Sequence, residues 1–583
     1  MQCFSLLIIT LHVTISEAVT WQWDDMVPVL YPSLPIAAPL SENESCRNDS
    51  RILLRALNNF TLWAVQMLDS SAQQPGGVLF GNVYQLGNFD ECLDVTGPVQ
   101  SQYCLTEVRA SVSTDTHIDP YIQNYDPESS VWDRIKNTGN PIRVTRGTVY
   151  QAVCVPASCS HQDIETAVSQ YLQKYQHPAG VQYTVSVAPD LCHTSQQKKF
   201  SYEDYIFICV MAVAVTLVIA GTALDYVYSG SSPGTCALGP ELLLCFSARR
   251  NMRQLDQKLS HQIDILRSMK FMFACLIILD HTGGLFGAAP LWNLAQLESE
   301  YQTVQLAILH RGEMIVDNFF VISGLLVAYV HLQVIPKKGL DLLRSSVSKI
   351  ARVLPASLVI IFFYATLFYK LGSGPRWVEV VRPERDYCQK NWWTNLLFIN
   401  NYVNSHHMCL LQSYFLACDM HFFITAIPVV MLLSKRPRTG VVVLVGILLA
   451  SILIPFLVTY LEHKPALLTF YVDFLVTPRA SDTFQTVYIK SHTRASPYFV
   501  GVAVGYLLYR LRDCKQRVGV VMSVMLCCTA LIVLFGIVMS GLAFHDPARP
   551  YSPLEAGIFA GTYRFVWSLA ISVIIVIIMH GKL

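Results

Sequence analysis

Apolar stretches about as long as a membrane span recur from residue 205 to the end of the chain. They lie near residues 205–228, 267–289, 314–333, 350–371, 413–434, 440–461, 496–511, 517–541 and 559–580. A helix needs about 20 mostly apolar residues to cross the hydrocarbon core of a bilayer. Of the 583 residues, 52% are hydrophobic and only 14% are charged, which is too apolar for a soluble protein of this length. We therefore expect a multipass α-helical membrane protein with about nine spans.

The segment before the first span is polar. Residues 1–18 resemble a secretory signal peptide, because an apolar stretch is followed by Ser16 and Ala18 at the −3 and −1 positions of a cleavage site. An uncleaved anchor is the alternative. Residues 19–204 contain three N-glycosylation sequons, at Asn43, Asn48 and Asn59. We expect this segment to form a mainly helical domain on the lumenal or extracellular side.

Clusters of basic residues follow alternate spans. They are Arg249, Arg250, Arg253 and Lys258; Lys337, Lys338 and Arg344; Lys435, Arg436 and Arg438; and Arg510, Arg512, Lys515 and Arg517. If residues 19–204 are lumenal, nine spans place every cluster in the cytosol, as the positive-inside rule requires. This orientation fits either the endoplasmic reticulum or the plasma membrane.

Cysteines of the predicted lumenal side form two groups. The polar domain holds an even set, which in an oxidising compartment indicates a disulfide framework: Cys46, Cys92, Cys104, Cys154, Cys159 and Cys192. Fifteen pairings of six cysteines are possible, and the sequence does not select among them. Cys388 and Cys409 share one lumenal loop, where we expect them to pair. His406 and His407 lie in the same loop, but no free carboxylate or thiolate completes a metal site, so no metal is expected.

Lys270 and His281 both lie inside the second apolar stretch. Ionisable residues inside a span are costly and indicate a functional site. Eleven residues at about 100° each bring the two side chains to one helix face, about 16 Å apart along the axis. A snorkelling lysine and a histidine packed on a neighbouring helix are the structural alternative. Asp280 precedes His281, and because sequence neighbours do not face each other on a helix, we do not expect it to orient the imidazole.

Other polar residues divide between the two ends of the spans. Asp317, Asn318, Asp419 and His421 fall in the half expected to be lumenal, and Arg267, Lys270, Lys349 and Arg352 fall at the cytosolic edge. One interpretation is a cavity with an anion-binding cytosolic mouth and a polar lumenal chamber. For the basic residues, the alternative is ordinary positive-inside flanking.

Motifs in both parts of the chain resemble one family. In the polar domain, residues 63–69, 75–77, 81–82, 87–92, 103–104 and 154–159 are similar to the N-terminal domain of the nose resistant to fluoxetine family. In the membrane part, residues 316–326 (VDNFFVISGLL) resemble the signature of the acyltransferase-3 membrane fold, which that family contains. Residues 392–395, 416–420 and 494–505 add further matches. The resemblance covers nearly the whole chain in the right order.

The resemblance implies an O-acyltransferase that takes an acyl group from cytosolic acyl-CoA and gives it to a hydroxyl of a lipid, sterol or glycan. The family's Arg/Lys followed ten residues later by His matches Lys270 and His281, which become the catalytic candidates. Its R/K-x-x-R pair matches Lys349 and Arg352, which become the candidates for acyl-CoA binding. Asp317, Ser323 and Asp419 are candidates for an acceptor chamber, with helix-end roles as the alternative. A neutral histidine suits proton abstraction from an alcohol near pH 7.

The sequence also departs from the family pattern. Tyr414 and His421 stand where we expect Trp and Gln, and Lys270 stands where Arg is commoner. The family continues through further spans, so residues 267–583 look like an acyltransferase-3 membrane domain truncated at its C-terminus. Residues 205–228 form the expected first span and 229–266 a cytosolic linker. The rival hypothesis is a non-catalytic protein that binds or transports lipids or small hydrophobic molecules. Neither hypothesis involves a permanently bound cofactor, and the sequence carries no nucleic-acid-binding signature.

Overall fold

The computed structural model describes residues 30–111, 128, 131–135, 142–174, 181–195, 198–228, 238–256, 261–301, 303, 311–338, 342–513, 518–546 and 549–580. The predicted signal peptide lies outside these residues. The chain divides into two compact units. The first comprises residues 1–118, 126–136 and 145–195, and the second comprises residues 119–125, 137–144 and 196–583.

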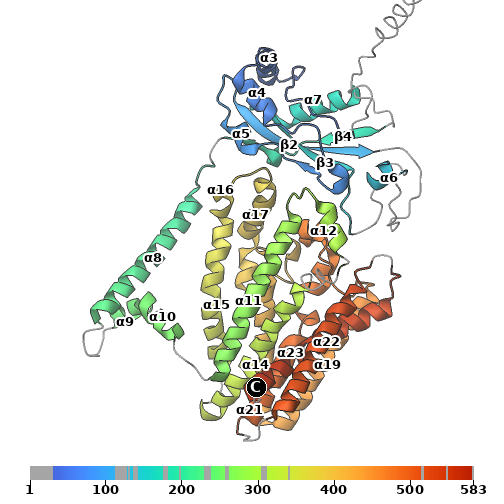
Figure 1. Ribbon diagram of the computed structural model, residues 1–583. Helices are drawn as coiled ribbons and strands as arrows, with labels where there is room; N and C mark the ends of the chain where they lie inside the picture. Colours follow the sequence, from blue (N-terminus) through green and yellow to red (C-terminus); the bar gives the residue numbers. More distant parts are fainter. Residues whose placement is uncertain are drawn as a thin grey trace, which may run out of the picture. The chain divides into compact units, whose positions relative to one another are not determined.

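The first unit is built on a five-stranded sheet with helices on both faces (Figure 1). The central strand β2 pairs antiparallel with β3, β4 and β5, and β1 pairs parallel with β3. Alternate residues of a strand point to opposite faces, so each face collects its own core. The strands are β1 (Tyr84–Gln85), β2 (Ser101–Ser111), β3 (Thr148–Pro156), β4 (Gln182–Ser186) and β5 (Cys192–Thr194).

Helices provide most of the regular structure of this unit, as predicted, although the sheet at its centre was not expected. Leu105 of β2 and Ala152 of β3 are buried with α3, α4 and α5 on one face of the sheet. Val108 and Val153 are buried with α7 on the other face. The helices are α3 (Glu44–Asn58), α4 (Leu62–Asp69), η1 (Val78–Phe80), α5 (Phe89–Asp94), α6 (Val131–Ile135), α7 (His161–Lys174) and η2 (Pro189–Leu191).

Three disulfides fasten this unit, and all six predicted cysteines take part. The pairs are Cys46–Cys159, Cys92–Cys154 and Cys104–Cys192. The structure therefore confirms the disulfide framework and selects one of its possible pairings. Each bridge joins a strand, or the turn after one, to an element distant in sequence.

The three sequons differ in their surroundings. Asn48 and Asn59 are exposed. Asn43 is half-buried, and its amide nitrogen, the atom that a glycan would occupy, lies 3.0 Å from the Ser158 carbonyl oxygen and 3.3 Å from Asp163. Asn43 also caps α3. Glycosylation stays a prediction, and the structure favours Asn48 and Asn59 over Asn43 as its sites.

The second unit is a bundle of helices (Figure 1), and eight of those described are long and apolar enough to cross a membrane. These eight are α8 (Tyr202–Tyr228), α11 (His261–Ala288), α14 (Gly312–Lys338), α15 (Leu342–Ala365), α18 (Tyr414–Lys435), α19 (Pro437–Leu461), α22 (Val520–Leu542) and α23 (Pro553–His580). The other elements are α9 (Leu238–Leu244), α10 (Ala248–Asp256), α12 (Leu294–Glu300), α16 (Phe368–Leu371), α17 (Trp377–Leu396), η3 (Ser405–His407), η4 (Leu411–Ser413), α20 (Val472–Val476), η5 (Pro478–Ala480), the π-helical η6 (Phe484–Tyr488), η7 (Ser491–Thr493) and α21 (Ser496–Leu511).

The predicted span at residues 496–511 is a short helix. Helix α21 has 16 residues, so it is about 24 Å long and shorter than the hydrocarbon core of about 30 Å. It runs parallel to α14, because Gly501 lies against Val321 and Gly505 lies against Leu325. The irregular segment before it, which includes η6 and η7, is largely buried. Irregular backbone is tolerated at membrane depth when protein surrounds it. The expected count of about nine therefore divides into eight long helices and one short one.

Close packing of α14 on α21 depends on glycines. A Cβ atom on Gly501 would lie 2.1 Å from the Val321 carbonyl oxygen, and one on Gly324 would lie 2.0 Å from the Tyr498 carbonyl oxygen. Gly501 and Gly505 form a G-x-x-x-G pair of the kind that lets membrane helices approach closely.

Replacing Gly501 by alanine is expected to destabilise the bundle by about 1–3 kcal/mol, because the added methyl group overpacks a backbone contact. The apparent melting temperature, measured by size-exclusion chromatography after heating, should fall. Gly536→Ala is the matched control, because Gly536 lies inside α22 and a methyl group added there would meet no atom within 4 Å. Equal stability of the two variants would contradict the packing role.

A short segment of the predicted N-terminal domain belongs to the second unit. Ile142 is buried with Leu294 and Tyr471, and the Val144 amide lies 2.9 Å from a Glu298 carboxylate oxygen. Residues 142–144 therefore group with the second unit, and the domain bounds 19–204 stay a prediction. The physical reason is that Ile142 finds an apolar cluster in the second unit.

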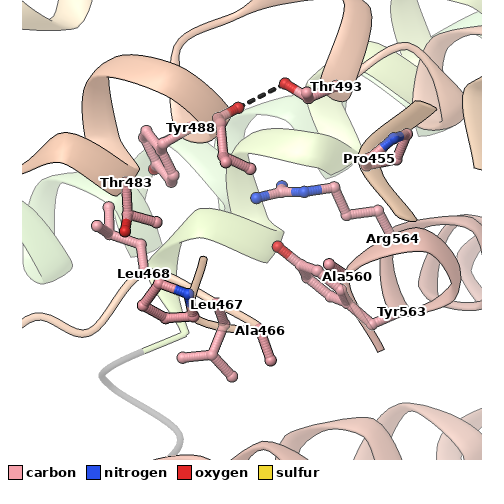
Figure 2. Close-up of a pocket in the computed structure, with 12 residues that line it drawn as sticks. Pro455, Ala466, Leu467, Leu468, Thr483, Tyr488, Thr493, Ala560, Tyr563 and Arg564 are labelled. Atoms are coloured by element: carbon pink, nitrogen blue, oxygen red, sulfur yellow. Dashed lines mark hydrogen bonds between the residues drawn. The ribbon is translucent and has the colours of Figure 1, made fainter. Parts of the chain in front are cut away.

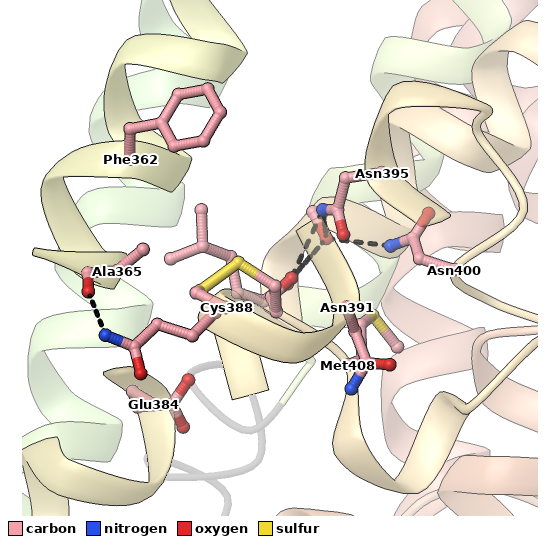
Figure 3. Close-up of a disulfide and its surroundings, with 12 residues drawn as sticks. Phe362, Ala365, Glu384, Cys388, Asn391, Asn395, Asn400 and Met408 are labelled. Atoms are coloured by element: carbon pink, nitrogen blue, oxygen red, sulfur yellow. Dashed lines mark hydrogen bonds between the residues drawn. A yellow bond between two sulfur atoms is a disulfide. The ribbon is translucent and has the colours of Figure 1, made fainter. Parts of the chain in front are cut away.

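The fourth disulfide joins Cys388 of α17 to Cys409, as predicted (Figure 3). Around it, the Asn395 amide donates to the Cys409 carbonyl oxygen at 3.2 Å and to Ser413 at 2.7 Å, and Asn400 donates to Ser413 at 2.8 Å. These contacts fix the loop between α17 and α18.

Removing this bridge by Cys388→Ser is expected to cost about 3 kcal/mol, the loop-closure value for cysteines 21 residues apart. The measurement is the melting temperature of the purified protein, with Cys527→Ser as control because Cys527 is a free cysteine. A Cys388→Ser variant as stable as this control would show that the bridge does not hold the loop.

Candidate functional site

Charged side chains from α11, α15 and α18 interact with one another. Lys349 Nζ lies 2.8 Å from Asp419 Oδ2 and 4.3 Å from the centre of the Phe423 ring. Ser323 of α14 donates to Asp419 Oδ1 at 2.8 Å. Lys270 of α11 interacts electrostatically with Asp419 and Lys349, and also with Arg352. We call Lys270, Lys349, Arg352 and Asp419 the cationic group, because it holds three positive charges and one negative charge.

The structure does not bring the predicted acceptor chamber together. Ser323 and Asp419 join the cationic group, which we expected at the opposite edge of the membrane. Asp317 belongs to a different network. Asp419 joins the cationic group through its 2.8 Å ion pair with Lys349, and Ser323 joins it through the hydrogen bond to Asp419.

Asp317 is the centre of a buried ion network. Its Oδ1 lies 2.7 Å from Arg494 Nη2, and its Oδ2 lies 2.5 Å from Arg564 Nη1. Arg564 Nη2 lies 2.8 Å from Glu313 Oε2. These four side chains are between 0% and 7% exposed. The network links α14, α23 and the segment before α21, and we call it the Asp317 network.

Sequence reasoning missed three members of the Asp317 network. Glu313 and Asp317 are four residues apart and therefore share a face of α14. Arg564 lies inside the apolar α23, where a charge is costly without a partner. Those two signals were present in the sequence. The partnership with Arg494 had no local signal, because that residue lies in an irregular segment.

A small pocket lies beside this network, and Arg564 extends toward Tyr488 and Tyr563 there (Figure 2). Its volume is about 20 Å³, enough for roughly one water molecule. Its lining includes Pro455, Thr493 and Ala560. The pocket is too small for an acyl chain or a sugar. We therefore assign the Asp317 network a role in stabilising the helix bundle and not in binding a substrate.

His281 lies on the open side of α11. Its side chain is 46% exposed, and its Nδ1 lies 2.9 Å from the Ile277 carbonyl oxygen. A carbonyl oxygen only accepts, so Nδ1 carries the proton of the neutral ring and Nε2 is free to accept one. Asp280 was not expected to orient the imidazole, and its carboxylate lies 3.7 Å from Nδ1, which is too far for a hydrogen bond.

Helices α11 and α15 are weakly covered by the rest of the protein. Only 6% of the apolar window of each is buried, against 61% for α14 and 56% for α18. Met269, Phe273 and Ile277 of α11 pack against the core clusters that contain α14. Lys270 and His281 share an edge beside this packed face. Membrane components can therefore reach the edge that carries both residues.

Two family models match the chain. Residues 46–168 match the model of the N-terminal domain of nose resistant-to-fluoxetine proteins. Residues 263–582, more than half of the chain, match the model of the acyltransferase domain. The chain belongs to the acyltransferase-3 family. It is a multipass membrane protein that combines this domain with the N-terminal domain of the nose resistant to fluoxetine family.

Two proteins from Caenorhabditis elegans are similar to this chain to different extents. Nose resistant to fluoxetine protein 6 is 23% identical over 85% of this chain, and the match spans 64% of that relative's length. Regulator of hypoxia-inducible factor 1 is 20% identical over 45% of this chain and 54% of its own length. No solved structure matches.

The acyltransferase-3 signature at residues 316–326 acquires physical roles in the structure. Asp317 forms ion pairs with two arginines, and Ser323 donates a hydrogen bond to Asp419. Gly324 has no side chain, so the backbone of α21 can pack against it. The signature therefore organises the bundle around α14, and it fixes the carboxylate that partners Lys349.

Proposed function

We propose that the protein is a membrane O-acyltransferase that moves an acyl group from acyl-CoA to a hydroxyl of a lipid, sterol or glycan. The observation that carries the proposal is the shared edge of α11. One end of this edge meets the cationic group, and the other presents the free Nε2 of His281. The acyltransferase domain match supports the same reaction class.

In this mechanism, His281 Nε2 takes the proton of the acceptor hydroxyl. The resulting oxygen nucleophile attacks the thioester carbonyl, the bond to sulfur breaks, and the coenzyme A thiolate takes the proton from His281. The products are an ester and free coenzyme A. Near neutral pH an imidazole is suited to both steps.

Lys270 and Arg352 are the residues that we assign to the phosphates of acyl-CoA. Lys349 is already paired with Asp419. We therefore assign Lys349 two roles, which are to position the Asp419 carboxylate and to attract acyl-CoA. We place the donor on the cytosolic side and the N-terminal domain on the lumenal or extracellular side, in the endoplasmic reticulum or the plasma membrane.

The proposal is tested by incubating the purified full-length chain with radiolabelled acyl-CoA and membrane lipids. We expect label to appear in a lipid or glycan product. Binding of acyl-CoA without any transfer would instead support the second candidate, a protein that binds or transports lipids. The open faces of α11 and α15 favour that candidate, because they offer apolar surface with no need for catalysis.

The Arg352→Ala variant is expected to weaken acyl-CoA binding roughly tenfold or more, because a charged contact with phosphate is lost. The Lys349→Ala/Arg352→Ala double variant should bind more weakly still. The matched control is Lys435→Ala/Arg438→Ala, an exposed pair with the same spacing of three. The measurement is acyl-CoA affinity in detergent micelles. If both double variants bind acyl-CoA with equal affinity, Lys349 and Arg352 do not bind the donor and are ordinary positive-inside residues.

A further inference from the structure

A serine and a histidine form a bonded pair that the proposed reaction does not use. Ser491 Oγ lies 2.8 Å from His421 Nδ1. Ser491 belongs to η7, and His421 lies in the first half of α18. Ser491 is 7% exposed and His421 is half-buried. The distance is that of a nucleophile hydrogen-bonded to its base.

The direction of this hydrogen bond depends on the tautomer of the His421 ring. The Phe398 carbonyl interacts with the His421 ring, and a carbonyl can only accept. Ser491 occupies Nδ1, so the ring proton belongs on Nε2, and Nδ1 accepts from the serine hydroxyl. Phe398 has a φ of 56°, a conformation that few residues other than glycine adopt. Ser491, His421 and the Phe398 carbonyl oxygen would then act as nucleophile, base and the group that orients the base.

Further contacts hold the serine in place. The Asn401 amide donates to Ser491 Oγ at 2.9 Å and to the Ile489 carbonyl oxygen at 3.1 Å. Lys490 donates to the Asn401 carbonyl oxygen at 2.8 Å, which brings a positive charge beside the site. Phe398 and Asn401 lie between α17 and α18, in the loop that also contains Cys409 of the fourth disulfide. The disulfide thus stabilises the loop that orients His421.

The pair lies close to accessible groups. Tyr402 is 44% exposed, and its ring centre lies 6.0 Å from that of His421. His492, the neighbour of Ser491, is exposed and its Nδ1 lies 2.8 Å from the Tyr402 hydroxyl. His421 stands seven residues into α18, about 10 Å from the start of the helix. An ester carbonyl would have to enter to this depth to meet Ser491.

We propose that His421 and Ser491 form a second acyl-transfer site, in which Ser491 takes up an acyl group from a carboxylic ester of the membrane-lipid class. His421 Nδ1 takes the serine proton as Ser491 Oγ attacks the ester carbonyl. The alcohol leaves with that proton, and an acyl-serine remains. Water or another alcohol then releases the acyl group and restores the serine. This chemistry needs neither acyl-CoA nor His281.

The test is labelling of the full-length protein in membranes with a fluorophosphonate probe, followed by mass spectrometry of the peptide that contains Ser491. We expect modification of Ser491 in the native protein and at least a tenfold lower rate in His421→Gln. Glutamine can still hydrogen-bond Ser491 but cannot take its proton. The Cys418→Ala variant is the matched control, because Cys418 lies 3.5 Å from Ser491 and should not be needed.

Two outcomes would overturn the proposal. One is a folded native protein whose Ser491 stays unmodified while an added serine hydrolase in the same membranes is labelled. The other is an equal labelling rate in His421→Gln, which would make the histidine a packing residue. Loss of acyl-CoA turnover with labelled Ser491 would reject the proposed transferase and leave this site standing, so the two failures are distinguishable.

Discussion

An Asp317→Ala variant is expected to lose about 3–5 kcal/mol of folding free energy, because it leaves two buried guanidinium groups without their shared carboxylate. Arg494 is fully buried, and Arg564 is 7% exposed. Glu313 still pairs with Arg564, but Arg494 forms no ion pair with a second carboxylate among the residues that the structure describes. The expected result is a protein that inserts into the membrane but is recovered folded at much lower yield.

Asp386→Ala is the control for this prediction. Asp386 also pairs with two arginines, Arg382 and Arg385, but its side chain is 39% exposed. Exposed ion pairs contribute about 0–1 kcal/mol, so this variant should behave like the native protein. The measurement is the apparent melting temperature in detergent micelles. Similar melting temperatures for the two variants would mean that the Asp317 network does not stabilise the bundle.

A His281→Gln variant is expected to lose a factor of about 10²–10⁴ in acyl transfer, the usual contribution of a general base. Glutamine has nearly the same reach as histidine, but it cannot accept a proton. The 46% exposed side chain carries little packing energy, so folding and membrane insertion should persist. Acyl-CoA affinity should also persist, because the cationic group lies about 16 Å away along α11.

The measurement for His281 is turnover of radiolabelled acyl-CoA beside its equilibrium binding. Thr282→Val is a matched control, because Thr282 is the exposed neighbour of His281 and, among the described residues, bonds only the Ile278 carbonyl oxygen of its own helix turn. Turnover by His281→Gln at the rate of this control would remove the catalytic assignment. The prediction that Lys349 and Arg352 bind acyl-CoA would still be testable, because it is measured by affinity and not by turnover.

Much of the membrane architecture was readable from the sequence. Apolar runs of sufficient length predict membrane helices because each helix satisfies its own backbone hydrogen bonds, whatever its neighbours are. The 3.6-residue repeat likewise placed Lys270 and His281 on one edge of α11 before any contact was known. The even set of cysteines was readable for the same reason, since their number is a property of the chain alone.

Only the tertiary structure decided which groups meet. It chose the three disulfide pairs of the first unit, joined Lys349 to Asp419, and gave Asp317 to Arg494 and Arg564. It also brought Ser491 to His421 across 70 residues of sequence. Periodicity is a property of one element, whereas a contact between elements depends on their depth, rotation and separation. These are set by packing such as that of Gly324 on α21, and packing is a property of the whole bundle.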